Sequence, residues 1–216
     1  MNKGFIFDLD GVIVDTAKFH YLAWKRLANE LGFDFTEEDN EQLKGVSRMR
    51  SLDILLELGG LDKSENEKLE LASKKNTWYL ELINNLTPSD LLPGAENFLK
   101  EASKKAVKIA LGSASKNAPF ILHKLEVDNL FDASIDGTKI SKAKPDPEVF
   151  LKGAEAIGLL PGNCLVFEDA QAGVEAAKNA GMKCIGIGSA NVLKKADYVV
   201  SGMDKVSVSQ ALELLN

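Results

Sequence analysis

Two kinds of hydrophobic pattern alternate along much of the chain. Short continuous apolar runs are typical of buried strands, whereas apolar residues that recur every three or four positions are typical of amphipathic helices. The short runs predict strands at 4–10, 107–111, 133–135, 164–167, 184–187 and 198–200. The periodic segments predict helices at 95–105, 117–125, 147–157 and 170–180. From Pro88 onward, strands and helices therefore alternate.

The segment from 16 to 87 has a different pattern. It carries only helical signals, which predict helices at 16–31, 36–44, 47–58 and 64–86. Thr36 and Ser64 are typical N-cap residues, and acidic residues follow each of them. Because no strand-like run interrupts this stretch, we predict an all-helical domain. It is inserted into a second domain made of 1–15 and 88–216.

The alternation outside the helical insert indicates the fold class. Strands that alternate with helices favour an α/β fold, with a parallel sheet covered by helices on both faces. Ligands bind such sheets at the carboxyl ends of the strands. Three of the predicted strands end in polar residues, namely Asp8 with Asp10, Ser113, and Glu168 with Asp169. We expect all five to lie at one edge of the sheet.

Composition and charge narrow the possible functions. With 45% hydrophobic and 27% charged residues, the chain is ordinary for a globular protein. A formal net charge of -6 argues against nucleic acid as the main partner, but a small phosphorylated substrate needs only a few basic residues. Cys164 and Cys184 lie in apolar runs and are expected to be buried free thiols. No signal pattern or membrane-length apolar run is present, so we expect a cytoplasmic protein. Nothing in the sequence demands more than a monomer, which is the oligomeric state that we expect.

The two acidic pairs predict a metal site. Asp8 with Asp10, and Glu168 with Asp169, each follow an apolar strand, where uncompensated carboxylates are costly. A hard cation offsets that cost, and carboxylates are the ligands that Mg²⁺ prefers. One such pair could simply end a strand or cap a helix. Two pairs at the same sheet edge favour a site for Mg²⁺, and a carboxylate there can also act as a nucleophile toward phosphorus.

Two further residues are suited to phosphate. Ser113 follows a predicted strand, so that its hydroxyl and the neighbouring backbone N–H groups can hold phosphate oxygens. Lys144 precedes Pro145 in a turn before a helix, and its ammonium is a mobile point charge that attracts phosphate. A lysine in a loop is often only solvated, but the order Asp8, Ser113, Lys144, Asp169 favours a functional role.

Four segments of the chain resemble, in order, the four motifs of the haloacid dehalogenase superfamily. They are Asp8-Leu-Asp10-Gly-Val, Ser113, Lys144-Pro and Glu168-Asp169. The resemblance implies a Rossmann-like core with the helical insert as its cap domain. It also implies that Asp8 becomes phosphorylated and that Asp10 is the general acid/base. The metal, Mg²⁺, would be held by Asp8, the backbone carbonyl of Asp10, Glu168 and Asp169.

Four further groups of residues carry a closer resemblance, namely His20 with Trp24, Lys44 to Arg48, Lys75 with Asn76, and Gly112 to Asn117. In residue type and spacing they resemble the β-phosphoglucomutase family within that superfamily. The resemblance implies interconversion of β-glucose 1-phosphate and glucose 6-phosphate through phospho-Asp8 and a 1,6-bisphosphate. The substrate-binding residues that it implies are Thr16, His20, Trp24, Lys44, Gly45, Val46, Ser47, Arg48, Lys75, Asn76, Ser113, Ala114, Ser115, Lys116, Asn117 and Lys144. Arg48 with Ser115, Lys116 and Asn117 would hold the phosphate that is not reacting.

Two alternatives remain open from the residues alone. A phosphatase of a small sugar phosphate would share all the core residues, because they do not decide which group accepts the phosphate. A catalytically silent sugar-phosphate-binding protein is the second alternative, which the intact acidic pairs oppose. The sugar is inferred from the resemblance, and another hexose would be chemically possible.

Overall fold

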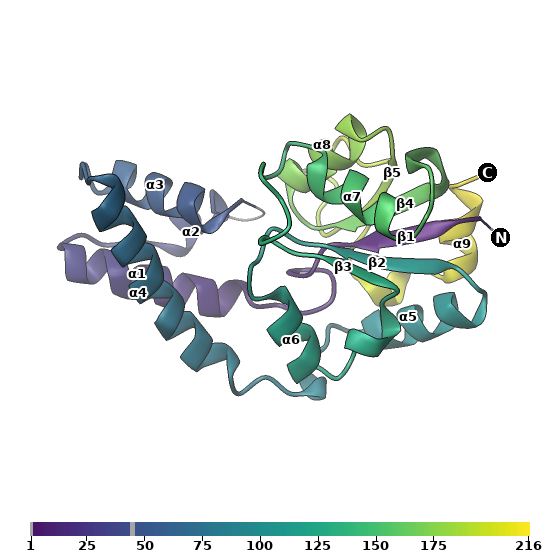
Figure 1. Ribbon diagram of the computed structural model, residues 1–216, viewed down its shortest axis with the longest axis horizontal. Helices are drawn as coiled ribbons and strands as arrows, with labels where there is room; N and C mark the ends of the chain where they lie inside the picture. The colour runs from purple at the N-terminus through teal and green to yellow at the C-terminus, as the bar shows by residue number, and fades with distance from the viewer. Residues whose placement is uncertain (1, 44–45) are drawn as a thin grey trace.

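A parallel six-stranded sheet forms the centre of the larger part of the molecule, as predicted (Figure 1). The computed structural model describes residues 2–43 and 46–216. The strand order is β3-β2-β1-β4-β5-β6. The strands are β1 (Gly4–Phe7), β2 (Lys108–Gly112), β3 (Ala133–Ile135), β4 (Cys164–Glu168), β5 (Lys183–Ile187) and β6 (Tyr198–Val200). All the pairings between them are parallel.

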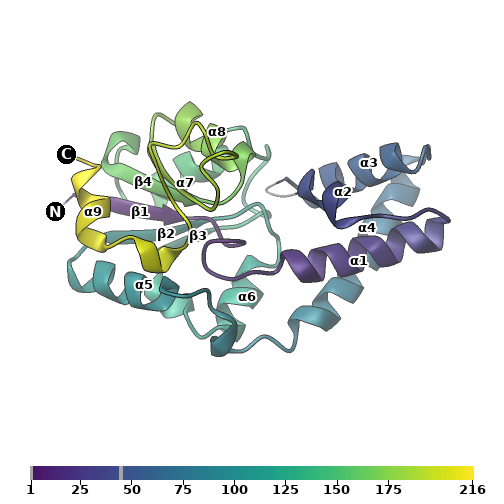
Figure 2. The ribbon, with the colours of Figure 1, turned by 180° about the vertical axis from the view of Figure 1, so that it is seen from behind.

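Helices cover both faces of the sheet. One face carries α5 (Ala95–Lys104), α6 (Ala118–Lys124) and α9 (Val208–Glu213), and the other carries α7 (Glu148–Ala156) and α8 (Gln171–Asn179) (Figures 1 and 2). The central strand β1 is fully buried because its side chains alternate between two apolar clusters. Phe5 and Phe7 belong to one cluster and Ile6 to the other. This double burial explains why β1 is a continuous apolar run.

Four helices make up the described part of the insert, which lies beyond the carboxyl ends of the strands (Figure 1). They are α1 (Ala17–Leu31), α2 (Glu37–Glu41), α3 (Arg48–Leu58) and α4 (Glu65–Ile83). Two segments connect the insert to the sheet, and they pair with each other. Val14 forms an antiparallel bridge with Leu91, and the Leu92 N–H donates to the Ile13 carbonyl over 2.9 Å.

The helix starts in the insert follow the expected capping chemistry. Thr36 and Asp39 form a reciprocal capping box at the start of α2, and Ser64 and Glu67 form another at the start of α4. At α3, the Ser47 hydroxyl accepts a hydrogen bond from the Arg50 N–H. Each cap satisfies an N–H group that the first helical turn leaves without a partner.

The structure corrects several of the predicted elements; for example, the strand predicted at 4–10 ends at Phe7, and the helix predicted at 64–86 ends at Ile83. The helix predicted at 36–44 ends at Glu41, because Leu43 turns back to donate to the Asn40 carbonyl and its side chain becomes buried. The C-terminal helix α9 and four short 3₁₀ helices were not predicted. The 3₁₀ helices are η1 (Pro88–Asp90), η2 (Asp128–Leu130), η3 (Pro161–Asn163) and η4 (Met203–Lys205). Among the described helices, none has the length and apolar character needed to cross a membrane.

Candidate active site

The polar strand ends converge at one edge of the sheet, as the pattern predicts. Asp8 directly follows β1, and its N–H donates to the Phe167 carbonyl of β4 over 2.9 Å. Ser113 directly follows β2 and donates its N–H to the Ile135 carbonyl of β3, also over 2.9 Å. These backbone bonds continue the sheet by one residue, so they hold both predicted site residues at its edge.

Three carboxylates form a compact cluster there. Asp8, Glu168 and Asp169 each offer an oxygen, and these oxygens lie within 4.8 Å of one another. Burial, and then the charge of Asp8, raises the pKa of Glu168 to about 7. Burial and the neighbouring carboxylates raise the pKa of Asp169 well above its ordinary value. Crowded acidic groups of this kind fit a hard divalent cation, which would relieve their repulsion.

Lys144 supplies positive charge to the cluster through contacts with two of its three carboxylates. Its Nζ lies 2.5 Å from Asp8 Oδ1 and 2.7 Å from Glu168 Oε2, and its side chain is fully buried. Burial opposes the charged form, but the two carboxylates outweigh it and raise the pKa of Lys144 above the ordinary lysine value. Lys144 is therefore a buried cation held by Asp8 and Glu168, and its role differs from that of a solvated loop lysine.

Asp10 is hydrogen-bonded to the segment that leads into the insert. Its carboxylate accepts a hydrogen bond from the hydroxyl of Thr16, which is fully buried. The Thr16 hydroxyl oxygen in turn accepts from the Tyr79 phenol over 3.0 Å. Burial and the charge of Asp8 raise the pKa of Asp10 to about 7, although the Thr16 hydrogen bond acts in the opposite direction. A carboxyl group with a pKa near neutrality can both take up and release a proton.

The loop after β2 extends from Ser113 to Asn117. The Ser113 hydroxyl accepts from the Ser115 N–H over 3.1 Å, and the Ser115 hydroxyl accepts from the Asn117 N–H over 3.2 Å. Ala114 is half-buried within this loop, and Lys116 is exposed. The Asn117 side chain donates to the Asn76 side chain of α4 over 3.0 Å, which joins the core loop directly to the insert.

Polar and aromatic residues of the insert gather around Lys75. Its Nζ lies 2.7 Å from His20 Nδ1 and 4.4 Å from the ring centroid of Trp24. Burial and the charges of Lys75 and Arg48 hold the pKa of His20 well below its ordinary value. Burial and the charge of Arg48 likewise lower the pKa of Lys75. The structure therefore brings His20, Trp24, Lys75 and Arg48 into one neighbourhood.

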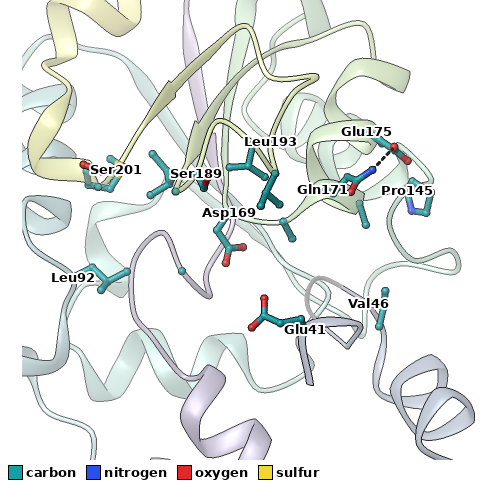
Figure 3. Close-up of a pocket in the computed structure, with 18 of the residues that line it drawn as sticks. Glu41, Val46, Leu92, Pro145, Asp169, Gln171, Glu175, Ser189, Leu193 and Ser201 are labelled. Atoms are coloured by element: carbon teal, nitrogen blue, oxygen red, sulfur yellow. Dashed lines mark hydrogen bonds between the residues drawn. The ribbon is translucent and has the colours of Figure 1, made fainter. Parts of the chain in front are cut away.

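The remaining predicted site residues lie where the insert approaches the core. Val46 lines a cavity of about 910 Å³ whose other walls include Asp169 and the loops after β5 and β6. Figure 3 shows the carboxylates of Asp169 and Glu41 pointing into the space between the two parts of the molecule. Ser47 acts as the N-cap of α3. The predicted site residues Lys44 and Gly45 lie outside the described residues.

A family model for haloacid dehalogenase-like hydrolases matches residues 2–181. The chain belongs to the haloacid dehalogenase-like hydrolase family. The family that the four motifs predict is thus confirmed.

The relatives that resemble this chain include both mutases and phosphatases. The chain is 45% identical over 200 residues to the β-phosphoglucomutase of Bacillus subtilis, a match that covers 92% of this chain and 88% of that protein. It is 33% identical over 183 residues to a phosphorylated carbohydrates phosphatase of Thermotoga maritima, with 83% and 82% covered. A crystal structure of β-phosphoglucomutase from Clostridium difficile matches with a TM-score of 0.97 and 44% identity, covering 100% of this chain and 98% of that one.

Sequence reasoning missed two residues of this haloacid dehalogenase-like site. Tyr79 lies four positions after Lys75 on α4, so both share one helix face, and that spacing was a readable signal. Gly173 lies inside α8, where glycine is unfavourable, and its lack of a side chain leaves room for the Glu168 carboxylate. A glycine within a helical pattern often marks such a close approach.

Gly173→Ala is expected to lower both stability and activity. A Cβ atom at this position would collide with the Glu168 carboxylate, which would be forced away from Lys144 or would displace α8. Overpacking of this kind costs about 1–3 kcal/mol, partly offset by the better helix propensity of alanine, about 1 kcal/mol. Urea unfolding and turnover measure the two effects.

Gly162→Ala is the control for this prediction, because the space around Gly162 is open. It should leave both quantities nearly unchanged. Wild-type turnover in the Gly173→Ala protein would show that Glu168 does not need the space that Gly173 leaves.

Proposed function

We propose that the chain is a Mg²⁺-dependent mutase that interconverts β-glucose 1-phosphate and glucose 6-phosphate. The observation that carries this proposal is the set of basic and aromatic side chains in the insert, facing a core that has its own phosphate loop. Asn76 and Asn117 join these two sides directly. The 45% identity to a protein named β-phosphoglucomutase supports the same reading.

Asp8 acts as the nucleophile in this proposal. Its Oδ1 is bound by Lys144, which leaves Oδ2 to attack phosphorus. Phosphate oxygens are received by the Ser113 hydroxyl and the N–H groups of the loop that follows it. A Mg²⁺ ion bound by Asp8, Glu168, Asp169 and the Asp10 carbonyl would reduce the repulsion between the carboxylates and the phosphate.

Asp10 transfers the proton. When the sugar 6-hydroxyl attacks phospho-Asp8, Asp10 takes the hydroxyl proton, and in the second half of the cycle it returns a proton to the oxygen that loses its phosphate. The pKa of about 7 allows both directions near neutral pH. Between these halves the 1,6-bisphosphate reorients, and Asp8 recovers the phosphoryl group from the 1-position.

The helical insert acts as a cap over the core. We place the hinges in the two paired segments around Ile13–Val14 and Leu91–Leu92, because both connections pass there. Closure would align the sugar with Asp10 and exclude water from phospho-Asp8. The exclusion of water distinguishes a mutase from a phosphatase, since both use the same core residues.

A single assay discriminates between these two functions. The enzyme is incubated with β-glucose 1-phosphate, Mg²⁺ and a trace of the bisphosphate, and glucose 6-phosphate and free phosphate are both measured. We expect glucose 6-phosphate without stoichiometric phosphate. Rapid phosphate release without isomer would instead favour the function named for the Thermotoga maritima relative.

Arg48→Ala is expected to weaken the binding of the bisphosphate while leaving the phosphorylation of Asp8 intact. Arg48 is half-buried at the start of α3, where a guanidinium can hold a phosphate with two hydrogen bonds. We expect the KM for bisphosphate to rise about 10–100-fold. This rise corresponds to the loss of one charge-assisted hydrogen-bonded pair, which contributes about 1.5–3 kcal/mol. Steady-state kinetics and labelling of Asp8 by acetyl phosphate measure the two properties.

Arg50→Ala is the matched control, because Arg50 is exposed on the same helix and pairs with Glu57 at 3.2 Å. It should change neither property. If Arg48→Ala reduces labelling and bisphosphate binding equally, Arg48 does not hold the distant phosphate.

A further inference from the structure

The ammonium of Lys144 has an aromatic neighbour in addition to its two carboxylates. Its Nζ lies over the ring of Phe150, 4.9 Å from the ring centroid. Both side chains are fully buried, so water does not take the place of the ring. A cation over an aromatic face is attracted by the quadrupole of the ring, and the attraction is strongest where water is excluded. Phe150 therefore adds an electrostatic contact to its apolar packing.

Helix α7 fixes the position of this ring. Phe150 lies in the first turn of α7, and its N–H donates to the Pro147 carbonyl over 3.1 Å. The helix packs against β1, β2 and β3, and Phe150 belongs to the same apolar cluster as Ile6 of β1. The Lys144 ammonium, in contrast, sits at the end of a flexible four-carbon stem. A fixed ring beside that ammonium restricts the positions that the charge can take.

Gly112 leaves the space that the ring occupies. It is the last residue of β2, immediately before Ser113. A Cβ atom at this position would lie 2.9 Å from Cδ1 and 3.1 Å from Cε1 of Phe150, which is closer than the normal contact distance of carbon atoms. Ile6 Cγ2 would lie 3.1 Å from the same Cβ atom, so a methyl group would be crowded from two sides. Any larger residue at 112 would push the ring away from its place.

We propose that Phe150 is a positioning residue that holds the Lys144 ammonium against Asp8, and that Gly112 is the residue that admits its ring. Lys144 binds Oδ1 of Asp8, so a displaced ammonium would turn the attacking Oδ2 away from phosphorus. This inference rests on the proposed function only through the assignment of Asp8 as the nucleophile. It holds whether a sugar hydroxyl or water accepts the phosphate.

The first test is Phe150→Leu, which removes the aromatic face and keeps a large apolar side chain. We expect kcat to fall about tenfold, with KM within about twofold of the wild-type value, because the residues predicted to bind the sugar keep their side chains. Labelling of Asp8 by acetyl phosphate should slow by a similar factor, because that reaction uses the same carboxylate.

Phe98→Leu is the matched control. Phe98 is equally a buried phenylalanine, but it lies on α5 at the other face of the sheet, where its ring packs against Phe5, Phe7 and Phe167. Phe98→Leu should lower Tm about as much as Phe150→Leu and keep the wild-type kcat and labelling rate. An equal loss of kcat in the two variants would overturn the proposal, because the effect would then come from the core in general.

Fluorination of the Phe150 ring separates its electrostatic contact from its packing. Phenylalanine with one, two or three fluorine atoms on the ring keeps the ring in place but weakens the negative potential of its face. We expect kcat and the rate of Asp8 labelling to fall step by step with the number of fluorine atoms. Wild-type rates throughout the series would show that the ring acts only as a filler.

The role of Gly112 is tested by Gly112→Ala alone and together with Phe150→Leu. Gly112→Ala should lower kcat about tenfold in the wild-type chain, since the new methyl group displaces the ring from Lys144. In the Phe150→Leu chain the same change should cost no more than about twofold, because the leucine side chain can turn away and no ring remains to be displaced. Losses that multiply would show that Gly112 acts independently of Phe150.

Failure of this proposal is distinct from failure of the proposed function. The products of the wild type alone decide between isomerisation and hydrolysis, whereas the differences between the variants decide the role of Phe150. If the wild type hydrolyses the sugar phosphate, the same variants are compared through phosphate release. A wild-type kcat in Phe150→Leu would refute the positioning role in either case.

Discussion

Asp8→Asn will abolish turnover and prevent phosphorylation of the chain. Asparagine keeps the size of the side chain and can still accept a hydrogen bond from Lys144, but its amide is a poor nucleophile. Loss of a nucleophile that acts together with its partners lowers kcat by about 10⁴-fold or more. The measurement combines the mutase assay with labelling by acetyl phosphate, in which a phosphoaspartate is recognised by its lability to base.

The control for this prediction is Asp62→Asn, since Asp62 is exposed in the insert and lies in the loop between α3 and α4. It should label and turn over like the wild type. Near-normal turnover in the Asp8→Asn protein would refute the nucleophile assignment. Absence of base-labile phosphate on the wild type itself would revive the alternative of a silent sugar-phosphate-binding protein.

The sheet and its functional edge were predictable because burial leaves a strong pattern. Strands such as β1 and β4 are buried on both faces, so they form unbroken apolar runs that stop where polar chemistry begins. The parallel topology then brings Asp8, Ser113 and Glu168 to one edge, whatever the details of packing. Capping residues such as Ser64 likewise mark helix starts through local chemistry.

The parts that were missed depend on weaker or non-local signals. The helix α9 is short, so its apolar periodicity is weak, and the capping box of Ser207 with Gln210 is its clearest local signal. The pairing of Lys144 with Glu168 joins residues that are 24 positions apart, and the Tyr79–Thr16 bond joins residues 63 apart. No periodic pattern specifies such contacts, because they arise only when the helices and loops pack against each other.

The site residues also differ in whether their neighbours in the sequence are enough to predict their contacts. The positions of Asp8 and Asp169 at strand ends predict that the two residues lie close together, as they do in the structure. In contrast, the sequence predicts that Lys144 is a mobile cation for phosphate, whereas the structure places it between two carboxylates. Its charge therefore balances the acidic cluster as well as any phosphate bound there.

This balance leads to a second large expected effect, in Lys144→Met. Methionine fills a similar volume but carries no charge, so Asp8 and Glu168 would remain buried beside each other without their cation. Breaking a buried pair by removing one partner costs about 3–5 kcal/mol. Turnover should also fall by about 10²–10³-fold, the usual cost of losing one charged or polar group that stabilises the transition state.

Urea unfolding with EDTA and then with Mg²⁺ measures the stability, and the mutase assay measures turnover. Mg²⁺ should restore part of the lost stability, because an ion that binds the folded carboxylates replaces some of the missing positive charge. Lys142→Met is the matched control, since Lys142 is two positions away, 71% exposed and paired with Asp146 at 3.5 Å. If both variants lose equal stability, or if Lys144→Met loses none, then the Lys144 ammonium does not balance the acidic cluster. The repulsion among the carboxylates, which helps to raise the pKa values of Glu168 and Asp169, would then have to be offset by the divalent ion alone.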